Sequence, residues 1–98
     1  MRIKFLPAAE SDLEEIFDYL YPESPGYADE FLNKFYSSLK KLERFPRSGK
    51  ITDIFNLNRA GYRYFKMGKY YIYYKIEEKT IYIFRIIHTA RDQSTILK

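Results

Sequence analysis

The residues best suited to chemistry stand near the carboxyl end, in the stretch IIHTARD from Ile86 to Asp92. This stretch holds His88, the only histidine of the chain, followed by Arg91 and Asp92. A histidine can exchange a proton near neutral pH, and an arginine can bind a phosphate or a carboxylate. The stretch therefore allows three interpretations: an active site, a docking surface for a larger partner, or the polar end of a strand.

Two further arginines join the candidate set. Arg85 interrupts an isoleucine-rich run, so its guanidinium must reach water, a carboxylate or a partner molecule. Arg63 stands in an earlier strand segment, from which it could share the face of Arg85. In the structural alternative, backbone groups satisfy His88, Arg85 forms a salt bridge, and Arg91 pairs with Asp92.

Two amphipathic helices precede these residues. Leu13, Ile16, Phe17 and Leu20 follow helical spacing from Ala8 onward. A second apolar stripe comprises Ala28, Phe31, Leu32, Phe35, Leu39 and Leu42. The prolines and the glycine of Tyr21–Gly26 predict a turn between the two helices. The sequence therefore predicts an antiparallel helical hairpin.

Four strands are expected around this hairpin. Arg2–Leu6 predicts a short first strand, and a period-two pattern predicts Tyr62–Met67, Tyr70–Ile76 and Thr80–His88 as a meander. The last strand is apolar on both faces, with Ile81, Ile83 and Ile87 on one face and Tyr82, Phe84 and Ile86 on the other, so it should lie in the middle of the sheet. Residues 46–61 form a connection without a recognisable role. We expect an α+β fold of order β-α-α-β-β-β, in which the helices cover one face of a mostly antiparallel four-stranded sheet and the other face is left for the tail, a partner or solvent.

Composition limits the function classes. The 98 residues fit one domain, 1–98, and their 11 Tyr and 8 Phe can fill its core. The absence of cysteine excludes disulfides and favours the cytoplasm, and neither a secretory segment nor a membrane span is expected. One histidine and four scattered glycines predict neither a metal site nor a nucleotide cofactor. The net charge of +4 favours an anionic partner.

The chain resembles the RelE/ParE superfamily of toxins from type II toxin–antitoxin modules, and its motifs resemble the ParE branch. The resemblance covers AAESDLEEIFDYL in the first helix, SLKKLERFPRSGK at the end of the second, and the sheet with its terminal His-x-x-Arg-Asp. It departs at Thr89 and Ala90, where ParE-like chains often carry a glycine and an extra arginine.

The resemblance implies two alternative activities. ParE-type toxins bind DNA gyrase and trap it on cleaved DNA without bond-making residues, whereas RelE-type toxins are metal-independent endoribonucleases that cut mRNA on the ribosome. The second activity would need a proton donor, a proton acceptor and cations around the phosphate. His88 would then act as acid or base, and the cations would come from Arg63, Arg85, Arg91, Lys66 and Lys69. The tail after His88 lacks the Tyr that RelE-type nucleases often use, which favours the gyrase inhibitor. The target-binding candidates are then Arg63, Arg85, His88, Arg91 and Asp92. The resemblance also implies a cognate antitoxin, with a homodimer or a toxin–antitoxin hetero-oligomer as the assembly.

Overall fold

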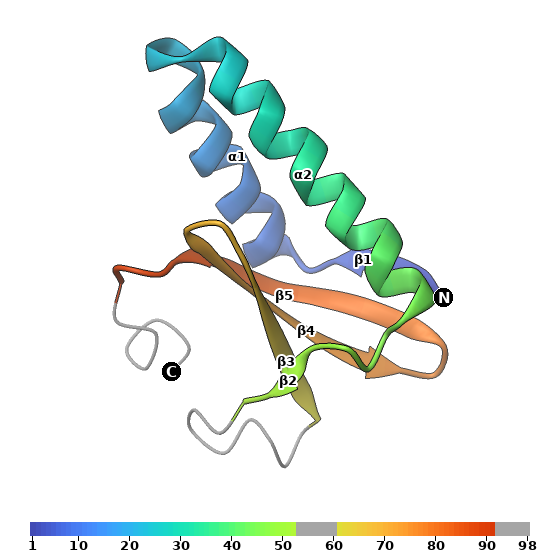
Figure 1. Cartoon of the computed structure of the whole chain (residues 1–98). Helices are drawn as coiled ribbons and strands as arrows, with labels where there is room; N and C mark the ends of the chain where they lie inside the picture. Colours follow the sequence, from blue (N-terminus) through green and yellow to red (C-terminus); the bar gives the residue numbers. More distant parts are fainter. Residues whose placement is uncertain (53–60, 92–98) are drawn as a thin grey trace.

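The computed structural model describes residues 1–52 and 61–91 and has the expected α+β architecture (Figure 1). Two antiparallel helices lie on one face of a sheet of order β1-β5-β4-β3-β2. The strands are β1 (Arg2–Phe5), β2 (Lys50–Ile51), β3 (Tyr62–Met67), β4 (Tyr70–Glu77) and β5 (Thr80–His88). The strand β5 is central, as predicted, because it pairs in parallel with β1 and antiparallel with β4.

The helices α1 (Pro7–Glu23) and α2 (Pro25–Arg44) are longer than the sequence suggested. The expected break between the helices lies within Tyr21–Gly26, but it is shorter than predicted, because Ser24 alone connects them. Pro22 is accommodated in the last turn of α1, and Pro25 opens α2 with the backbone angle that a first helical residue requires. The apolar stripe of α2 is confirmed, since Phe31, Phe35 and most of its other members are buried.

A fifth strand distinguishes the sheet from the predicted four. Lys50 and Ile51 pair with Tyr64 and Arg63 at the edge of β3. Two residues are too few for a period-two pattern to be recognised in a sequence. Of the connection predicted over residues 46–61, residues 53–60 lie outside the described residues.

A bulge in β5 corrects the predicted assignment of its faces. Tyr73 is in register with Arg85, but Tyr74 is in register with Ile83, so Phe84 is an extra residue. Because one extra residue reverses the alternation of side chains, Ile86 rather than Ile87 joins Ile81 and Ile83 in the core beneath the helices. A sequence pattern alone does not reveal such a shift.

The sheet face away from the helices carries its own small cluster. Tyr73 and Ile87 are buried there, with half-buried Tyr64, Tyr71 and Phe84 packed around them. The far face is therefore partly apolar and partly buried rather than bare. The period-two pattern predicted for Tyr70–Ile76 is confirmed, because Tyr70 and Tyr74 belong to the core on the helix side and Tyr71 and Tyr73 to the cluster on the far face.

Candidate functional site

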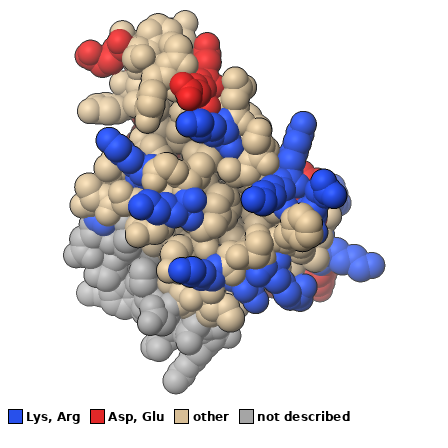
Figure 2. Space-filling view, in the orientation of Figure 1, with Lys and Arg blue, Asp and Glu red and all other residues tan. Residues whose placement is uncertain are grey.

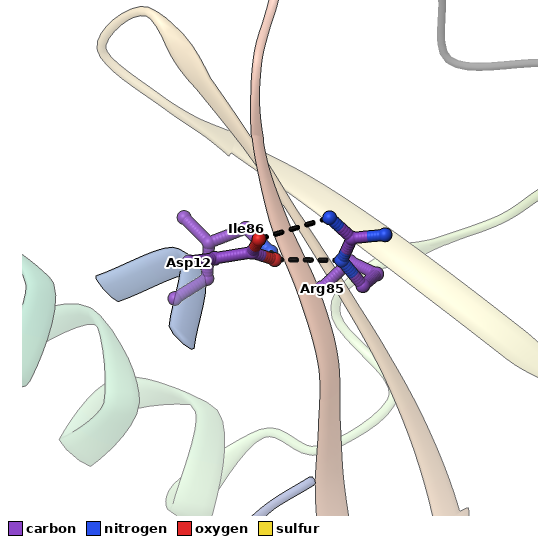
Figure 3. A network of polar contacts seen from close by, with 3 residues as sticks. All are labelled: Asp12, Arg85 and Ile86. Atoms are coloured by element: carbon purple, nitrogen blue, oxygen red, sulfur yellow. Dashed lines mark hydrogen bonds and ion pairs between the residues drawn. The ribbon is translucent and has the colours of Figure 1, made fainter. Parts of the chain in front are cut away.

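Arg85 is held by Asp12 of α1 (Figure 3). Its Nε donates to Oδ2 of Asp12 at 2.7 Å, and its Nη2 donates to Oδ1 at 2.9 Å. The backbone N–H of Ile86 donates to the same Oδ2 at 2.9 Å. The carboxylate thus receives three hydrogen bonds, and the alternative of a structural salt bridge describes Arg85 correctly.

The position of this pair follows from the length of β1. The last residue of β5 in register with β1 is Ile83, so the edge of β5 beyond it has no neighbouring strand. Asp12 takes the place of that strand by accepting the hydrogen bond of Ile86. The hydrogen bond from Arg85 to Asp12 raises the pKa of the guanidinium against the opposing effect of burial. Arg85 therefore stays charged at any pH at which the fold persists.

Arg63 lies elsewhere. It is in register with Tyr74 and therefore faces the helix side, whereas Arg85 is in register with Tyr73 and emerges on the far face. Arg63 and Arg85 therefore do not share a face of the sheet, although the sequence allowed it. The sequence pattern reveals neither the strand register nor the bulge that separates the two arginines. Nη1 of Arg63 donates to the carbonyl of Gly49 at 2.8 Å and to that of Arg47 at 3.3 Å.

Tyr74 also holds the segment that follows α2, residues 46–49. Its buried hydroxyl donates to the carbonyl of Pro46 at 2.7 Å and accepts the N–H of Gly49 at 2.9 Å. A side chain at position 49 would overlap the tyrosine ring, so glycine is required for this close approach. The chain after α2, for which the sequence suggested no role, is thus fixed on the sheet by Tyr74 and Arg63.

His88 and Arg91 do lie together. They line an open groove of about 400 Å³ between α1 and the end of β5, called here the β5 groove. Its other lining residues are Asp12, Glu15, Ile16, Tyr19, Tyr70 and Ile86. Nδ1 of His88 accepts the N–H of Ala90 at 3.0 Å, and the imidazole ring stands edge-on to Tyr70 at 5.3 Å. The hydrogen bond places the proton of the neutral imidazole on Nε2.

The groove is chemically mixed. Arg91 lines the same groove as two carboxylates, those of Asp12 and Glu15, and the exposed ring of Tyr19. Phosphate binding favours a cluster of cations, but Arg63 and Arg85 are hydrogen-bonded away from this groove. The arrangement can bind a surface with apolar and mixed polar groups. Asp92 lies outside the described residues.

The sequence interpretation missed the partner of Arg85 and the aromatic wall of the groove. Asp12 stands three residues after buried Ala9 and four before Ile16, so it occupies the apolar stripe of α1, where an acid signals a buried partner. For Tyr19 no comparable signal exists, since exposed tyrosines also occur at several other positions of the helices.

Two further properties hold for the described part of the chain. No cluster of three or more His, Cys, Asp or Glu that could hold a metal ion occurs there. Neither described helix is long and apolar enough to cross a membrane.

Comparison with known proteins defines the class. The family model described as the ParE toxin of the type II toxin–antitoxin system parDE matches residues 3–93. The chain therefore belongs to the ParE toxin family, which confirms the resemblance found in its motifs. Membership implies an antitoxin as partner.

The fold agrees with this family. The chain is similar to a solved structure of the chromosomal ParDE toxin–antitoxin system from P. aeruginosa, with a TM-score of 0.73 and 20% identity. The likeness covers 90% of this chain and 95% of that chain. At this identity it concerns the fold. No curated protein matches the chain.

Proposed function

We propose that this chain, as a single toxin domain, blocks DNA replication in the cytoplasm by binding DNA gyrase, and that a cognate antitoxin neutralises it. The observation that supports binding over catalysis is the distribution of the candidate residues. His88 and Arg91 meet in the β5 groove, while Arg63 and Arg85 are engaged by Gly49 and Asp12. A phosphate clamp for RNA cleavage would need these cations around one site.

The proposed target-binding surface is the β5 groove and the turn that follows it. The turn is ordered by backbone hydrogen bonds from Thr89 to Lys69 at 2.8 Å and from Arg91 to His88 at 3.0 Å. An ordered turn lowers the entropy lost when a partner binds. Asp92, which follows Arg91 in the sequence, stays a target-binding prediction, as do Arg63 and Arg85.

Gyrase and ribosome assays separate the two activities. Purified protein is incubated with supercoiling gyrase and, separately, with translating ribosomes and mRNA. The proposal expects loss of supercoiling with accumulated cleaved DNA. Active gyrase together with codon-located cuts in the mRNA would instead identify a ribosome-dependent endoribonuclease.

The His88→Ala variant tests the role of the histidine. A nuclease that uses His88 for proton transfer should lose activity by a factor on the order of 10²–10⁴. A binding surface should instead lose affinity for gyrase by a factor of about 10, because one contact is removed and no reaction step depends on it. The matched control is Tyr36→Ala, which removes an exposed aromatic ring from α2 outside the β5 groove.

The antitoxin is proposed to cover the helical hairpin and the sheet. Four tyrosines of the helices are 48–77% exposed, namely Tyr19, Tyr21, Tyr27 and Tyr36, and offer apolar surface to an amphipathic segment. Co-expression with the adjacent reading frame should yield a stable toxin–antitoxin hetero-oligomer. The toxin in it is either a homodimer or a single copy. Two separately purified proteins that do not associate would contradict this part of the proposal.

A further inference from the structure

Charge is unevenly distributed over the molecule. Eight of the 13 acidic residues lie between positions 10 and 30, whereas residues 5–33 contain neither Lys nor Arg. Of the acidic side chains that are visible in Figure 2, most stand at the tip of the helical hairpin, and Lys and Arg gather lower down, around the end of α2 and the sheet. Between positions 31 and 52 the only acid is Glu43, against six cations.

Three open grooves with shared lining residues lie in this basic region. Their volumes are about 540, 300 and 300 Å³, and Ser48 lines all three. Five cations line them, and we call these the basic track: Lys41, Arg44, Arg47, Lys50 and Lys66. Among the described residues, no Asp or Glu lines any of the three grooves. The β5 groove differs, because it contains Asp12 and Glu15.

The segment that carries the centre of the basic track is fixed in place. Gly49, which lies between Arg47 and Lys50, is hydrogen-bonded through its N–H to Tyr74 and through its carbonyl to Arg63. Lys50 itself belongs to β2 and pairs with β3. These cations are therefore presented by ordered backbone, which reduces the entropic cost of binding a partner with a regular charge spacing.

The aromatic rings near the basic track indicate how a partner would be recognised. Tyr64 and Tyr71 pack against each other at 5.7 Å, and Phe65 packs against Tyr74 at 6.1 Å. Phe45 is 56% exposed, but the guanidinium of Arg44 stands over its ring at 5.8 Å. Since these rings already have neighbours, stacking with unpaired bases is disfavoured relative to contact with phosphates.

We propose that the basic track binds the sugar-phosphate backbone of duplex DNA. Five cations that line neighbouring grooves, without a described carboxylate among them, match a polyanion whose charges repeat along its length. Such binding is independent of sequence and strongly salt-dependent. It would allow the toxin to contact DNA at the same time as a protein target bound at the β5 groove.

The test is the affinity of the full chain for a fluorescent duplex of about 20 base pairs, measured at several salt concentrations from about 50 mM upward. The Arg44→Gln/Arg47→Gln double variant removes two side chains of the basic track. The control is Arg2→Gln/Lys4→Gln, which removes the same charge from exposed positions of β1. Circular dichroism verifies that both variants are folded.

We expect the first double variant to lower the slope of log affinity against log salt by about 2 and to weaken binding at least about tenfold, with the control within about twofold of the original chain. Equal losses in both variants, or no salt-dependent binding, would overturn the inference. Tighter binding of a single-stranded oligonucleotide or of poly-glutamate than of the duplex would also overturn it. Because no gyrase is present, the result is independent of the proposed target: DNA binding without gyrase inhibition would refute only the proposed function.

Discussion

At the scale of single residues, Asp12 links the two layers of the fold. It is 8% exposed on α1 and bonds both the guanidinium of Arg85 and the N–H of Ile86 on β5. A buried carboxylate is costly unless its oxygens are hydrogen-bonded, and here they receive three donors. Asp12 and Arg85 therefore act as a structural unit that orients the wall of the β5 groove.

The Asp12→Ala variant should lose about 3 kcal/mol of unfolding free energy, because the charge of Arg85 and the N–H of Ile86 are left without the carboxylate. Urea denaturation measures the loss. The Asp12→Ala/Arg85→Leu double variant should regain part of it, since the unpaired charge is gone.

The control for this prediction is Glu30→Ala. Glu30 pairs with Lys34 on the surface of α2, where the two side chains are 60% and 68% exposed. Its removal should change the unfolding free energy by less than about 0.5 kcal/mol. A similarly small effect of Asp12→Ala would contradict the structural role assigned to Asp12.

Tyr73 gives the protein a predicted alkaline transition. Burial, with Tyr71 and Tyr64 nearby, raises the pKa of Tyr73 from 10.0 to about 12. Since the folded pKa is the higher one, this contribution to stability is complete below the unfolded pKa and is lost as the pH rises from about 10 to about 12. Burial also raises the pKa values of Tyr70 and Tyr74, so absorbance titration of tyrosinate should show several late-ionising groups. Their number should fall by one in Tyr73→Phe and stay the same in Tyr36→Phe. A Tyr73 that titrates at its ordinary pKa would refute its burial.

At the scale of elements, the connection from α2 into β2 is set by one close approach. Gly49 lies against the ring of Tyr74, whereas Gly26, near the start of α2, has open space around its Cα. The two glycines therefore form a matched pair for substitution by alanine.

Gly49→Ala should destabilise the fold by about 1–3 kcal/mol, because the methyl group must displace the ring of Tyr74. Gly26→Ala should be neutral or stabilise by up to about 1 kcal/mol, since alanine favours the helix. Thermal unfolding compares the two variants. Equal melting temperatures would show that Tyr74 does not contact the segment.

The turn between β4 and β5 is a site for stabilisation. Glu78 and Lys79 have φ angles of 48° and 69°, a region that glycine and asparagine adopt more easily. Lys79→Gly should therefore raise the unfolding free energy by about 1 kcal/mol. Guanidinium denaturation measures the change, and Gly68→Lys at the β3–β4 turn, where φ is 59°, should have the opposite sign.

Local periodicity predicted the elements well and their mutual register poorly. The stripe of α2 and the alternation of β4 are set by neighbouring residues, so the sequence contains them. The bulge at Phe84 and the pairing of Lys50 with Tyr64 depend on contacts between distant segments. A shift of one residue there decided which isoleucine enters the core and separated Arg63 from Arg85.

At the scale of the whole molecule, the candidate site was only partly predictable. The sequence placed His88 and Arg91 at the end of a central strand, and the structure brings both to the β5 groove. It did not indicate that Glu15 and Tyr19 of α1 form the opposite wall, because that depends on how α1 crosses β5. The sequence order already separates the acidic residues 10–30 from the basic residues 31–52. The fold brings the cations together on the face shown in Figure 2, around the end of α2 and the sheet.

The proposed binding to gyrase is measured most directly by the supercoiling activity of gyrase, titrated with the purified protein at fixed gyrase concentration. A toxin that acts by binding should inhibit in proportion to the gyrase sites it occupies, with cleaved DNA accumulating until those sites are filled. Undiminished supercoiling at a large excess of the protein, together with cuts in ribosome-bound mRNA, would contradict it.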